Sequence, residues 1–478
     1  MRVTRLAIAV TLAGLCLPGM VWAQGSFEPV LRQPGTVRQA SLPYDQAVQG
    51  ESGVGGLAWA GGAVAPEPSQ AGAAQPAPQQ AGPPVEYGPG PEMADPCPPP
   101  APWKLPQPCL LQNLGIAMGG WVQQGITFNA DKPADRFNGP VTTNDRDREY
   151  QLNQAWLYFV RPTKTDGCGW DLGGRVDLVW GTDWRYGQSF GLEDRINASH
   201  DFYGWILPQF YAEVAVNNLT IKAGHFATMT SYEVIPPVLN FFYSHSYLMA
   251  GYFDPLLVTG VQADYKIGDN WTAVAGFNRG WMMFEDPIDT LHFLGGVKWA
   301  SDDKRTNVSV MVDTGREVGF TGEHERTSAI TLLTHKFNDK LFYGSQYTVG
   351  REVGGSFVEP GDDADWYGME HVLIYTLNPK WSAGLRYEWV RDQDGSRIAG
   401  IGNVLLSDRG WNGLPGFTGS FHDLSFGLNW RPRPNFVLRP EIRWDWYAGP
   451  ENPFGQLPFD NFTRRDQFLF AVDLLTTF

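Results

Sequence analysis

From about residue 114 to the C-terminus, apolar and polar residues alternate with a period of two. The clearest segment spans residues 435–447. One of its faces carries Phe436, Leu438, Pro440, Ile442, Trp444 and Trp446, and the other carries Val437, Arg439, Glu441, Arg443 and Asp445. Because successive side chains of a β-strand point to opposite faces, this segment has one apolar wall and one charged wall. The final segment, 467–478, repeats the alternation, and the pattern predicts an all-β chain.

Turn signals divide this region into about 16 strands. Short connectors rich in Asn, Asp, Gly and Pro, such as 217–218 and 268–270, are typical of hairpin turns. They alternate with longer connections, which we place at 130–148, 182–204, 227–255, 281–290, 315–325, 353–364, 392–419 and 448–465. Strict alternation of this kind is typical of a barrel whose two rims each collect one type of connection. We therefore predict a closed antiparallel up-and-down transmembrane β-barrel of about 16 strands, with roughly 14 to 18 as the range.

The size of the barrel decides which wall meets lipid. Eight strands leave an interior that side chains fill, whereas about sixteen enclose an aqueous channel. The charged walls would then face water in the lumen, and the apolar walls would face hydrocarbon. Tryptophans near segment ends are expected in two interfacial girdles: Trp121, Trp156, Trp180, Trp271, Trp299, Trp381, Trp389, Trp430, Trp444 and Trp446. The last strand ends in Phe478, which we interpret as the signal read by the outer-membrane assembly machinery.

The N-terminal fifth of the chain differs from the rest. Residues 1–23 are a predicted signal peptide, because two arginines precede an apolar stretch and Ala23 ends a small-residue cleavage site. Residues 24–108 are dense in Pro, Gly, Ala and Gln and lack periodicity, which predicts a disordered periplasmic tether. The barrel domain is expected over residues 109–478.

Charge and cysteine content narrow the partners and the compartment. A net charge of −15 argues against a nucleic-acid partner, since such binding needs a basic face. After cleavage the chain keeps Cys97, Cys109 and Cys168 in an oxidising compartment. Cys109 precedes the first strand and Cys168 lies between the second and third, so both are expected at the periplasmic rim. We predict a disulfide that uses Cys109, with Cys168 or Cys97 as its partner, and we expect no metal and no cofactor.

One stretch carries a family resemblance. Its residues are Ala223-Gly-His-Phe-Ala-Thr228, Tyr232-Glu233, Asn240-Phe-Phe-Tyr-Ser-His-Ser-Tyr247 and Thr259-Gly-Val261. This stretch resembles the beta-barrel porin family described as OmpL-like, and the overall plan resembles that family over roughly 110–478. The resemblance implies an outer-membrane porin that lets small hydrophilic solutes or ions diffuse passively through a water-filled barrel. It implies no catalytic residues.

The charged walls supply candidate pore-lining residues. They are Arg175, Asp177, Lys222, Asp264, Lys266, Lys298, Arg386, Glu388, Arg439, Glu441, Arg443 and Asp445. Both signs of charge occur, so anion and cation preference stay open. The long connection after the fifth predicted strand often folds into a porin lumen, and His225, Glu233, His245 and Asp254 are candidates for a constriction there. The alternative is a loop packed over the rim by its aromatic side chains.

Two other functions compete with the porin. A surface adhesin or structural barrel would bind a partner through its long loops. A hydrolase embedded in the barrel wall would need a histidine–carboxylate pair, for which His200–Asp201 and His422–Asp423 are the nearest candidates. For the porin we expect a location in the outer membrane of a diderm bacterium, with lipid, small polar solutes or ions and the assembly machinery as partners. Porins of this size are often trimers, so a homotrimer is also expected.

Overall fold

The computed structural model describes residues 102–140, 143–165, 167–197, 202–228, 230–250, 253–319, 322–356, 358–359, 361–398 and 416–478. The predicted signal peptide, nearly all of the predicted tether, Cys97 and the His200–Asp201 pair lie outside these residues.

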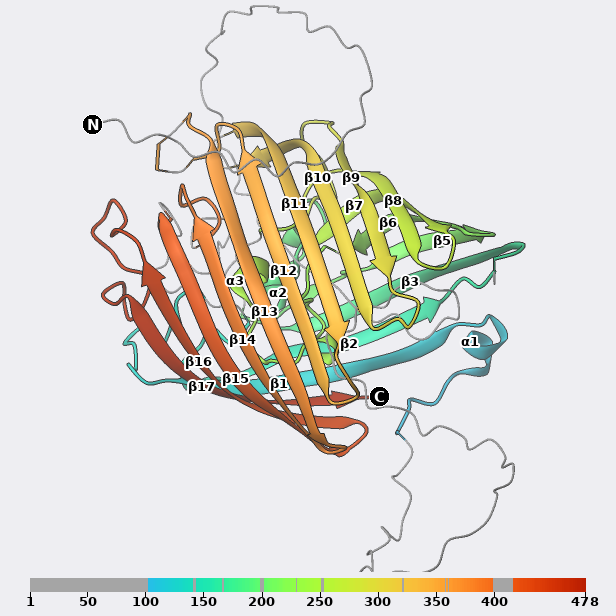
Figure 1. Cartoon of the computed structure of the whole chain (residues 1–478), viewed down its shortest axis with the longest axis horizontal. Coiled ribbons are helices and arrows are strands. Elements are labelled where there is room, and N and C mark those ends of the chain that lie inside the picture. Colours follow the sequence, from blue (N-terminus) through green and yellow to red (C-terminus); the bar gives the residue numbers. More distant parts are fainter. Residues whose placement is uncertain are drawn as a thin grey trace, which may run out of the picture. The chain divides into compact units, whose positions relative to one another are not determined.

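One antiparallel sheet dominates the described residues (Figure 1). Its strands are β1 (Ala117–Asn129), β2 (Tyr150–Arg161), β3 (Trp170–Gly181), β4 (Gly204–Ile206), β5 (Phe210–Val216), β6 (Leu219–Ala227), β7 (Leu257–Ile267), β8 (Trp271–Asn278), β9 (His292–Ala300), β10 (Thr306–Gly319), β11 (Gly322–Lys336), β12 (Leu341–Glu352), β13 (Ala364–Asn378), β14 (Trp381–Asp392), β15 (Gly419–Arg433), β16 (Phe436–Ala448) and β17 (Asp466–Thr477).

The sheet closes on itself, because β17 pairs with β1 from Trp121↔Thr477 to Asn129↔Leu469. Strands β4 and β5 both pair with β3, at its two ends, and together fill one strand position. The closed ring therefore has sixteen positions, and the predicted fold class is confirmed. Closure gives each of the sixteen positions a neighbour on both sides, so the ring has no free end strand.

Helices are few and short in this part of the chain. They are α1 (Cys109–Asn113), α2 (Trp184–Gly187), η1 (Glu193–Arg195), η2 (Pro237–Leu239) and α3 (Tyr247–Ala250). Among the described residues, no helix is both long enough and apolar enough to cross a bilayer.

The two walls of the barrel follow the predicted alternation. On β16, Ile442 and Trp444 are 41% and 43% exposed, whereas Arg443 between them is 1% exposed. Neighbouring strands pair outward-facing tryptophans near the short-turn rim, with ring centroids 6.4 Å apart for Trp271–Trp299 and 5.9 Å apart for Trp381–Trp430. These positions suit an interfacial girdle.

Two tryptophans depart from the predicted girdle. Trp121 and Trp156 are each 1% exposed and stack on one another inside the barrel, with ring centroids 4.5 Å apart. The indole nitrogen of Trp121 donates to Gln154, and that of Trp156 donates to Asp177. The girdle prediction is wrong for this pair, because polar partners on the inner wall satisfy both indoles.

One predicted long loop is also wrong. Residues 315–319 and 322–325 continue β10 and β11 rather than forming a loop. The ladder extends because side chains pair across it: Thr314 with Thr327 at 2.7 Å and Arg316 with Glu323 at 3.0 Å.

Of the two predicted disulfide partners of Cys109, Cys168 is not bonded to it, and Cys97 lies outside the described residues. Cys109 and Cys168 are both exposed free thiols. Cys168 is held in its own turn, where its N–H donates to the carbonyl of Thr165, while Cys109 opens α1. The two thiols thus belong to separately anchored segments of the rim.

Candidate functional site

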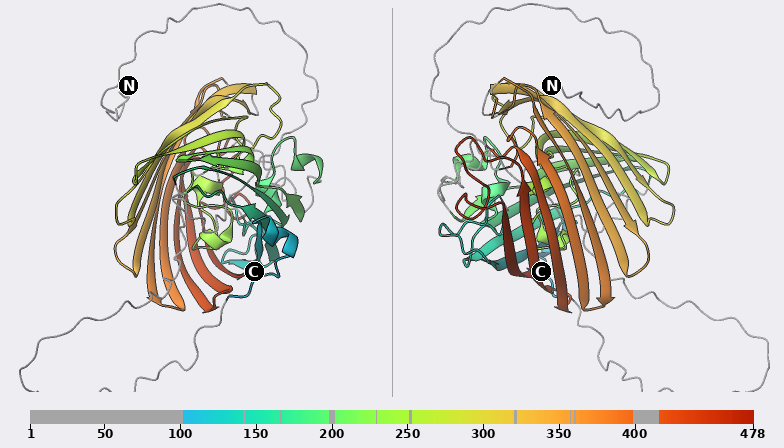
Figure 2. Two further views of the ribbon diagram at one scale, coloured as in Figure 1. Left: turned by 90° about the vertical axis from the view of Figure 1, so that its right-hand side faces the viewer. Right: turned by 60° about the vertical axis from the view of Figure 1, so that its left-hand side comes forward.

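The connection between β6 and β7 lies inside the ring of strands, where Figures 1 and 2 show α3 enclosed by the barrel. We call residues 228–256 the inner loop; it contains η2 and α3. Nearly all of its described side chains are buried. Because a loop whose described residues include only two very short helices leaves many backbone groups without partners of its own, the wall around it must supply them.

Apolar contacts hold one side of the inner loop. Its Tyr232, Phe241 and Phe242 form a buried cluster with four inward-facing residues of neighbouring strands: Ile330 and Leu332 of β11, and Val372 and Ile374 of β13. Apolar side chains lining water in a pore would cost free energy, about 25 cal/mol per Å² of exposed surface. The apolar side chains of this wall therefore favour its coverage by the inner loop.

Inward glycines provide sockets for the aromatic rings of the loop. A Cβ atom added at Gly344 of β12 would lie 2.1 Å from the ring of Tyr232, and one at Gly384 of β14 would lie 2.3 Å from the ring of Phe241. Real Cβ atoms do not approach other atoms so closely. Any larger residue at these positions would displace the loop.

Carboxylates of the wall bind the backbone of the inner loop. Glu388 of β14 accepts the N–H groups of Tyr247 and Leu248, at 2.5 and 2.6 Å. Glu441 of β16 accepts those of Tyr243 and Ser244, at 2.8 and 3.2 Å. Charge-assisted bonds of this kind satisfy loop donors that would otherwise be buried without partners.

Arginines of the same wall bind loop carbonyls and a loop carboxylate. Arg386 donates to Glu233 at 2.6 Å and to the carbonyl of Ser244 at 2.9 Å. Arg439 donates to the carbonyls of Pro237 and Asn240, both at 3.0 Å. Arg443 donates to the carbonyl of His245 at 2.6 Å. These guanidinium groups bind the inner loop and are therefore not exposed to solutes in the pore.

A row of carboxylates crosses four adjacent strands at one level. The strand register places Glu370 opposite Glu388, Glu388 opposite Asp423, and Asp423 opposite Asp445. Arg386 pairs with Asp423, and Arg443 pairs with Asp445 at 2.8 Å. Like charges placed directly opposite each other destabilise a sheet, so these arginines and the loop donors offset the repulsion.

Glu370 is the exception within this row. It is fully buried, and neither of its carboxylate oxygens has a hydrogen-bond partner among the described residues. The buried hydroxyl of Tyr232 in the inner loop also lacks a partner there.

The two ends of the inner loop meet on β12. Gln346 accepts the N–H of Tyr232 at 2.6 Å and donates to Asp254. Asp254 also accepts from Ser231 at 3.1 Å and from Thr348 at 3.0 Å. Burial among these neutral donors raises the pKa of Asp254 to about 7. The carboxyl group is therefore close to half-ionised at neutral pH.

The twelve predicted pore-lining residues divide between two walls. Six lie on β14 and β16 against the inner loop: Arg386, Glu388, Arg439, Glu441, Arg443 and Asp445. The other six lie on β3, β6, β7 and β9: Arg175, Asp177, Lys222, Asp264, Lys266 and Lys298. In this second group Arg175 pairs with Asp177 at 2.7 Å, and Lys298 pairs with Asp264 at 2.8 Å. The Lys222 ammonium lies 4.6 Å from the ring centroid of Phe226.

The four predicted constriction residues are not all brought together. Glu233 and His245 approach to 3.6 Å, and burial lowers the pKa of His245 to about 4, so its imidazole is neutral at pH 7. Asp254 lies at the far end of the inner loop, where it accepts hydrogen bonds from Gln346 and Thr348 of β12. His225 belongs to β6, where it contacts Ser189 and Thr259.

The His422–Asp423 pair considered for a hydrolase cannot act together. These neighbours on β15 face opposite sides of the wall. His422 stacks on Trp446, with ring centroids 4.7 Å apart, while Asp423 binds Arg386 in the interior. A histidine and a carboxylate can act as a catalytic pair only when their side chains lie within hydrogen-bond distance of each other.

A comparison with family models decides the identity. The model of the family described as putative beta-barrel porin-2, OmpL-like, matches residues 115–478. The chain belongs to this porin family. The porin family resemblance inferred from residues 219–265 is thereby confirmed, and the barrel is that of an outer-membrane porin.

Solved structures share the fold of this porin at low sequence identity. The outer membrane channel DcaP of Acinetobacter baumannii is 10% identical, with a TM-score of 0.50, over 76% of this chain and 97% of that one. An anion-selective porin from Comamonas acidovorans is also 10% identical, with a TM-score of 0.50, over 76% of this chain and 99% of that one. Among curated proteins, none matches this porin significantly.

Proposed function

We propose that this porin lets small hydrophilic solutes or ions diffuse passively past the inner loop, which acts as a fixed constriction. The solute path runs along the wall formed by β3 and β5–β9, while the inner loop occupies the opposite wall. The observation that carries this proposal is the contrast between the walls. The Asp264 side chain is 27% exposed, whereas the Arg386 side chain is 0% exposed beneath the loop.

The path wall carries both signs of charge. Lys298 and Asp264 form a partly exposed ion pair across β9 and β7, whereas Arg175 and Asp177 form a buried pair on β3. Paired charges of opposite sign create a transverse field that orients dipolar solutes, whereas a ring of one sign would select ions of the other sign. The geometry therefore favours small polar solutes of either charge over apolar ones.

The test is electrical. Purified full-length protein is inserted into planar lipid bilayers, and current is recorded in a concentrated salt solution. The proposal predicts stepwise openings of uniform size, and a reversal potential under a salt gradient close to zero because the path carries both signs. Persistent electrical silence of protein shown to be folded would contradict the proposal and would favour an adhesin.

Three expectations from the sequence stay predictions. N-terminal sequencing of the mature protein tests cleavage after Ala23. Native mass spectrometry of the detergent-purified protein tests the homotrimer. Hydrolysis assays on lipid and peptide substrates test the expectation that the protein is not an enzyme.

A further inference from the structure

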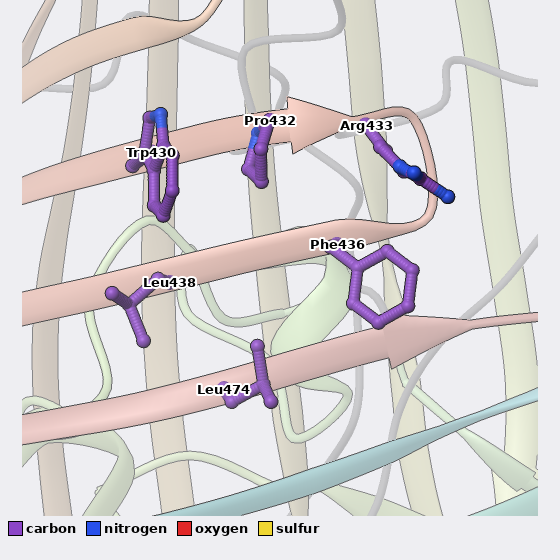
Figure 3. A pocket seen from close by; sticks show the side chains of 6 residues that line it. All are labelled: Trp430, Pro432, Arg433, Phe436, Leu438 and Leu474. Carbon is purple, nitrogen blue, oxygen red and sulfur yellow. The ribbon is translucent and has the colours of Figure 1, made fainter. Parts of the chain in front are cut away.

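A groove runs along the outer wall at the short-turn rim (Figure 3). It has a volume of about 300 Å³ and is lined by Trp430, Pro432 and Arg433 of β15, Phe436 and Leu438 of β16, and Leu474 of β17. Trp430 and Phe436 are 36% and 37% exposed. The residues that alternate with the lining ones, such as Arg439 and Asp473, face the interior, so the groove opens toward lipid.

The groove combines an apolar floor with a cation at its rim end. Trp430, Leu438 and Leu474 lie opposite one another on adjacent strands, and Arg433 ends β15 at the rim, opposite Phe436. Short turns of outer-membrane barrels face the periplasm, so Arg433 lies at the level of the lipid headgroups of the periplasmic leaflet. Its guanidinium is suited to bind a phosphate through two hydrogen bonds.

The cations around this groove lack counterions in the protein. Arg433 and Lys380, from the neighbouring β13–β14 turn, are both exposed, and neither forms an ion pair with any described residue. The carbonyl of Lys380 accepts the N–H of Arg431, which places this turn beside β15.

Two cations beside other short turns of the same rim have counterions. Arg161 pairs with Asp171 at 2.9 Å beside the β2–β3 turn, and Lys336 pairs with Asp339 at 2.9 Å in the β11–β12 turn. The groove is thus flanked by uncompensated positive charge, which is complementary to an anionic headgroup.

We propose that this groove binds an anionic glycerophospholipid of the periplasmic leaflet. The phosphate lies against Arg433 and Lys380, and one acyl chain lies along Trp430, Leu438 and Leu474. Each basic residue near an anionic lipid surface contributes about 1 kcal/mol, and apolar contact with the acyl chain adds to it.

The test counts bound lipids by native mass spectrometry. Full-length protein in mild detergent is titrated with dioleoyl phosphatidylglycerol or dioleoyl phosphatidylcholine. Unchanged protein is expected to retain one phosphatidylglycerol at concentrations where phosphatidylcholine does not bind. Arg433→Gln is expected to weaken phosphatidylglycerol binding about fivefold, because one headgroup contact is lost. Leu474→Trp, which fills the floor of the groove and keeps Arg433, is expected to weaken the binding of that lipid as well.

The matched control is Lys336→Gln, which removes a rim cation that already has a counterion. It is expected to leave lipid binding unchanged. Heat-dependent migration on SDS gels checks that every variant retains the folded barrel.

Several outcomes would overturn the proposal. In the first, unchanged protein binds the two lipids equally well. In the second, Arg433→Gln and Lys336→Gln lose phosphatidylglycerol binding to the same extent. Displacement of phosphatidylglycerol by a peptide with the sequence of residues 92–101 would assign the groove to the chain's own N-terminal region. Binding that appears only after an oligomer is dissociated would assign the groove to a second copy.

Discussion

At the scale of single residues, small side chains on the wall matter as much as charged ones. Gly344 and Gly384 leave the space that Tyr232 and Phe241 of the inner loop occupy. Arg386 satisfies Glu233 of the loop and Asp423 of the wall at once. The position of the inner loop is therefore specified by shape and by hydrogen bonding together.

Gly384→Val should dislodge the inner loop. The added side chain would overlap Phe241, and overpacking of this kind typically costs about 1–3 kcal/mol. We expect a lower free energy of unfolding together with larger and noisier single-channel currents. The double variant Gly384→Val/Phe241→Ala removes the overlapping ring and should restore quiet currents. Noise that persists in the double variant would show that the socket is not the cause.

Asp254 should make stability depend on pH. Its pKa is about 7 in the folded protein and has an ordinary value of 3.8 in the unfolded chain. Between these values the folded protein holds a proton that the unfolded chain has released, so the free energy of unfolding falls as the pH rises from about 4 to 7. The side chain of the Asp254→Asn variant cannot titrate. In this variant the free energy of unfolding should therefore fall less steeply over this pH range, as measured by chemical unfolding at several pH values.

The control for this experiment is Asp303→Asn, which lies in an exposed short turn. In this variant the free energy of unfolding should depend on pH between 5 and 7 as it does in the unchanged protein. An unaltered slope in Asp254→Asn would contradict the assigned role of Asp254.

At the scale of elements, the strands were far more predictable than what lies against them. The alternation on β16 already placed Arg443 on one wall and Trp444 on the other, and the structure bears out that division. A strand has only two faces, so a period of two is enough to assign them. The alternation does not say whether an inward charge meets water or a loop.

A signal for the buried wall was nevertheless present. Val372 and Ile374 are apolar residues on the inner face of β13, where a wall lining water would be polar. Glu370 and the glycine sockets were missed, and Asp423 was considered only beside His422, because their neighbours depend on strand register and on a loop over a hundred residues away along the chain. The extent of β10 and β11 was missed because Gly315 resembles a turn residue.

The inner loop should behave as a fixed element. Ser244 of the loop and Ser425 of β15 both accept from the same guanidinium nitrogen of Arg386, at 2.8 and 3.3 Å, so their hydroxyls are neighbours. In a Ser244→Cys/Ser425→Cys variant, a short bifunctional thiol reagent should join them without altering single-channel conductance. Ser425→Cys alone with the same reagent is the control. A clear fall in conductance after cross-linking would mean that the loop normally leaves this wall.

At the scale of the whole molecule, the barrel has two unequal halves. Strands β11–β17 bind the inner loop through apolar residues, carboxylates and arginines, and β3 with β5–β9 presents polar and charged side chains that the loop does not bind. The closed ring supplies a rigid frame for both halves. This division makes the protein a water-filled porin whose lumen is narrowed from one side by the inner loop.

The most direct test of this division is thiol accessibility during current recording. In a chain whose Cys97, Cys109 and Cys168 are replaced by serine, Lys222→Cys lies on the path wall and Ile330→Cys lies under the inner loop. We predict that a charged methanethiosulfonate reagent reduces the current stepwise through Lys222→Cys and leaves the current through Ile330→Cys unchanged. Modification of Ile330→Cys with no effect at Lys222→Cys would contradict the account.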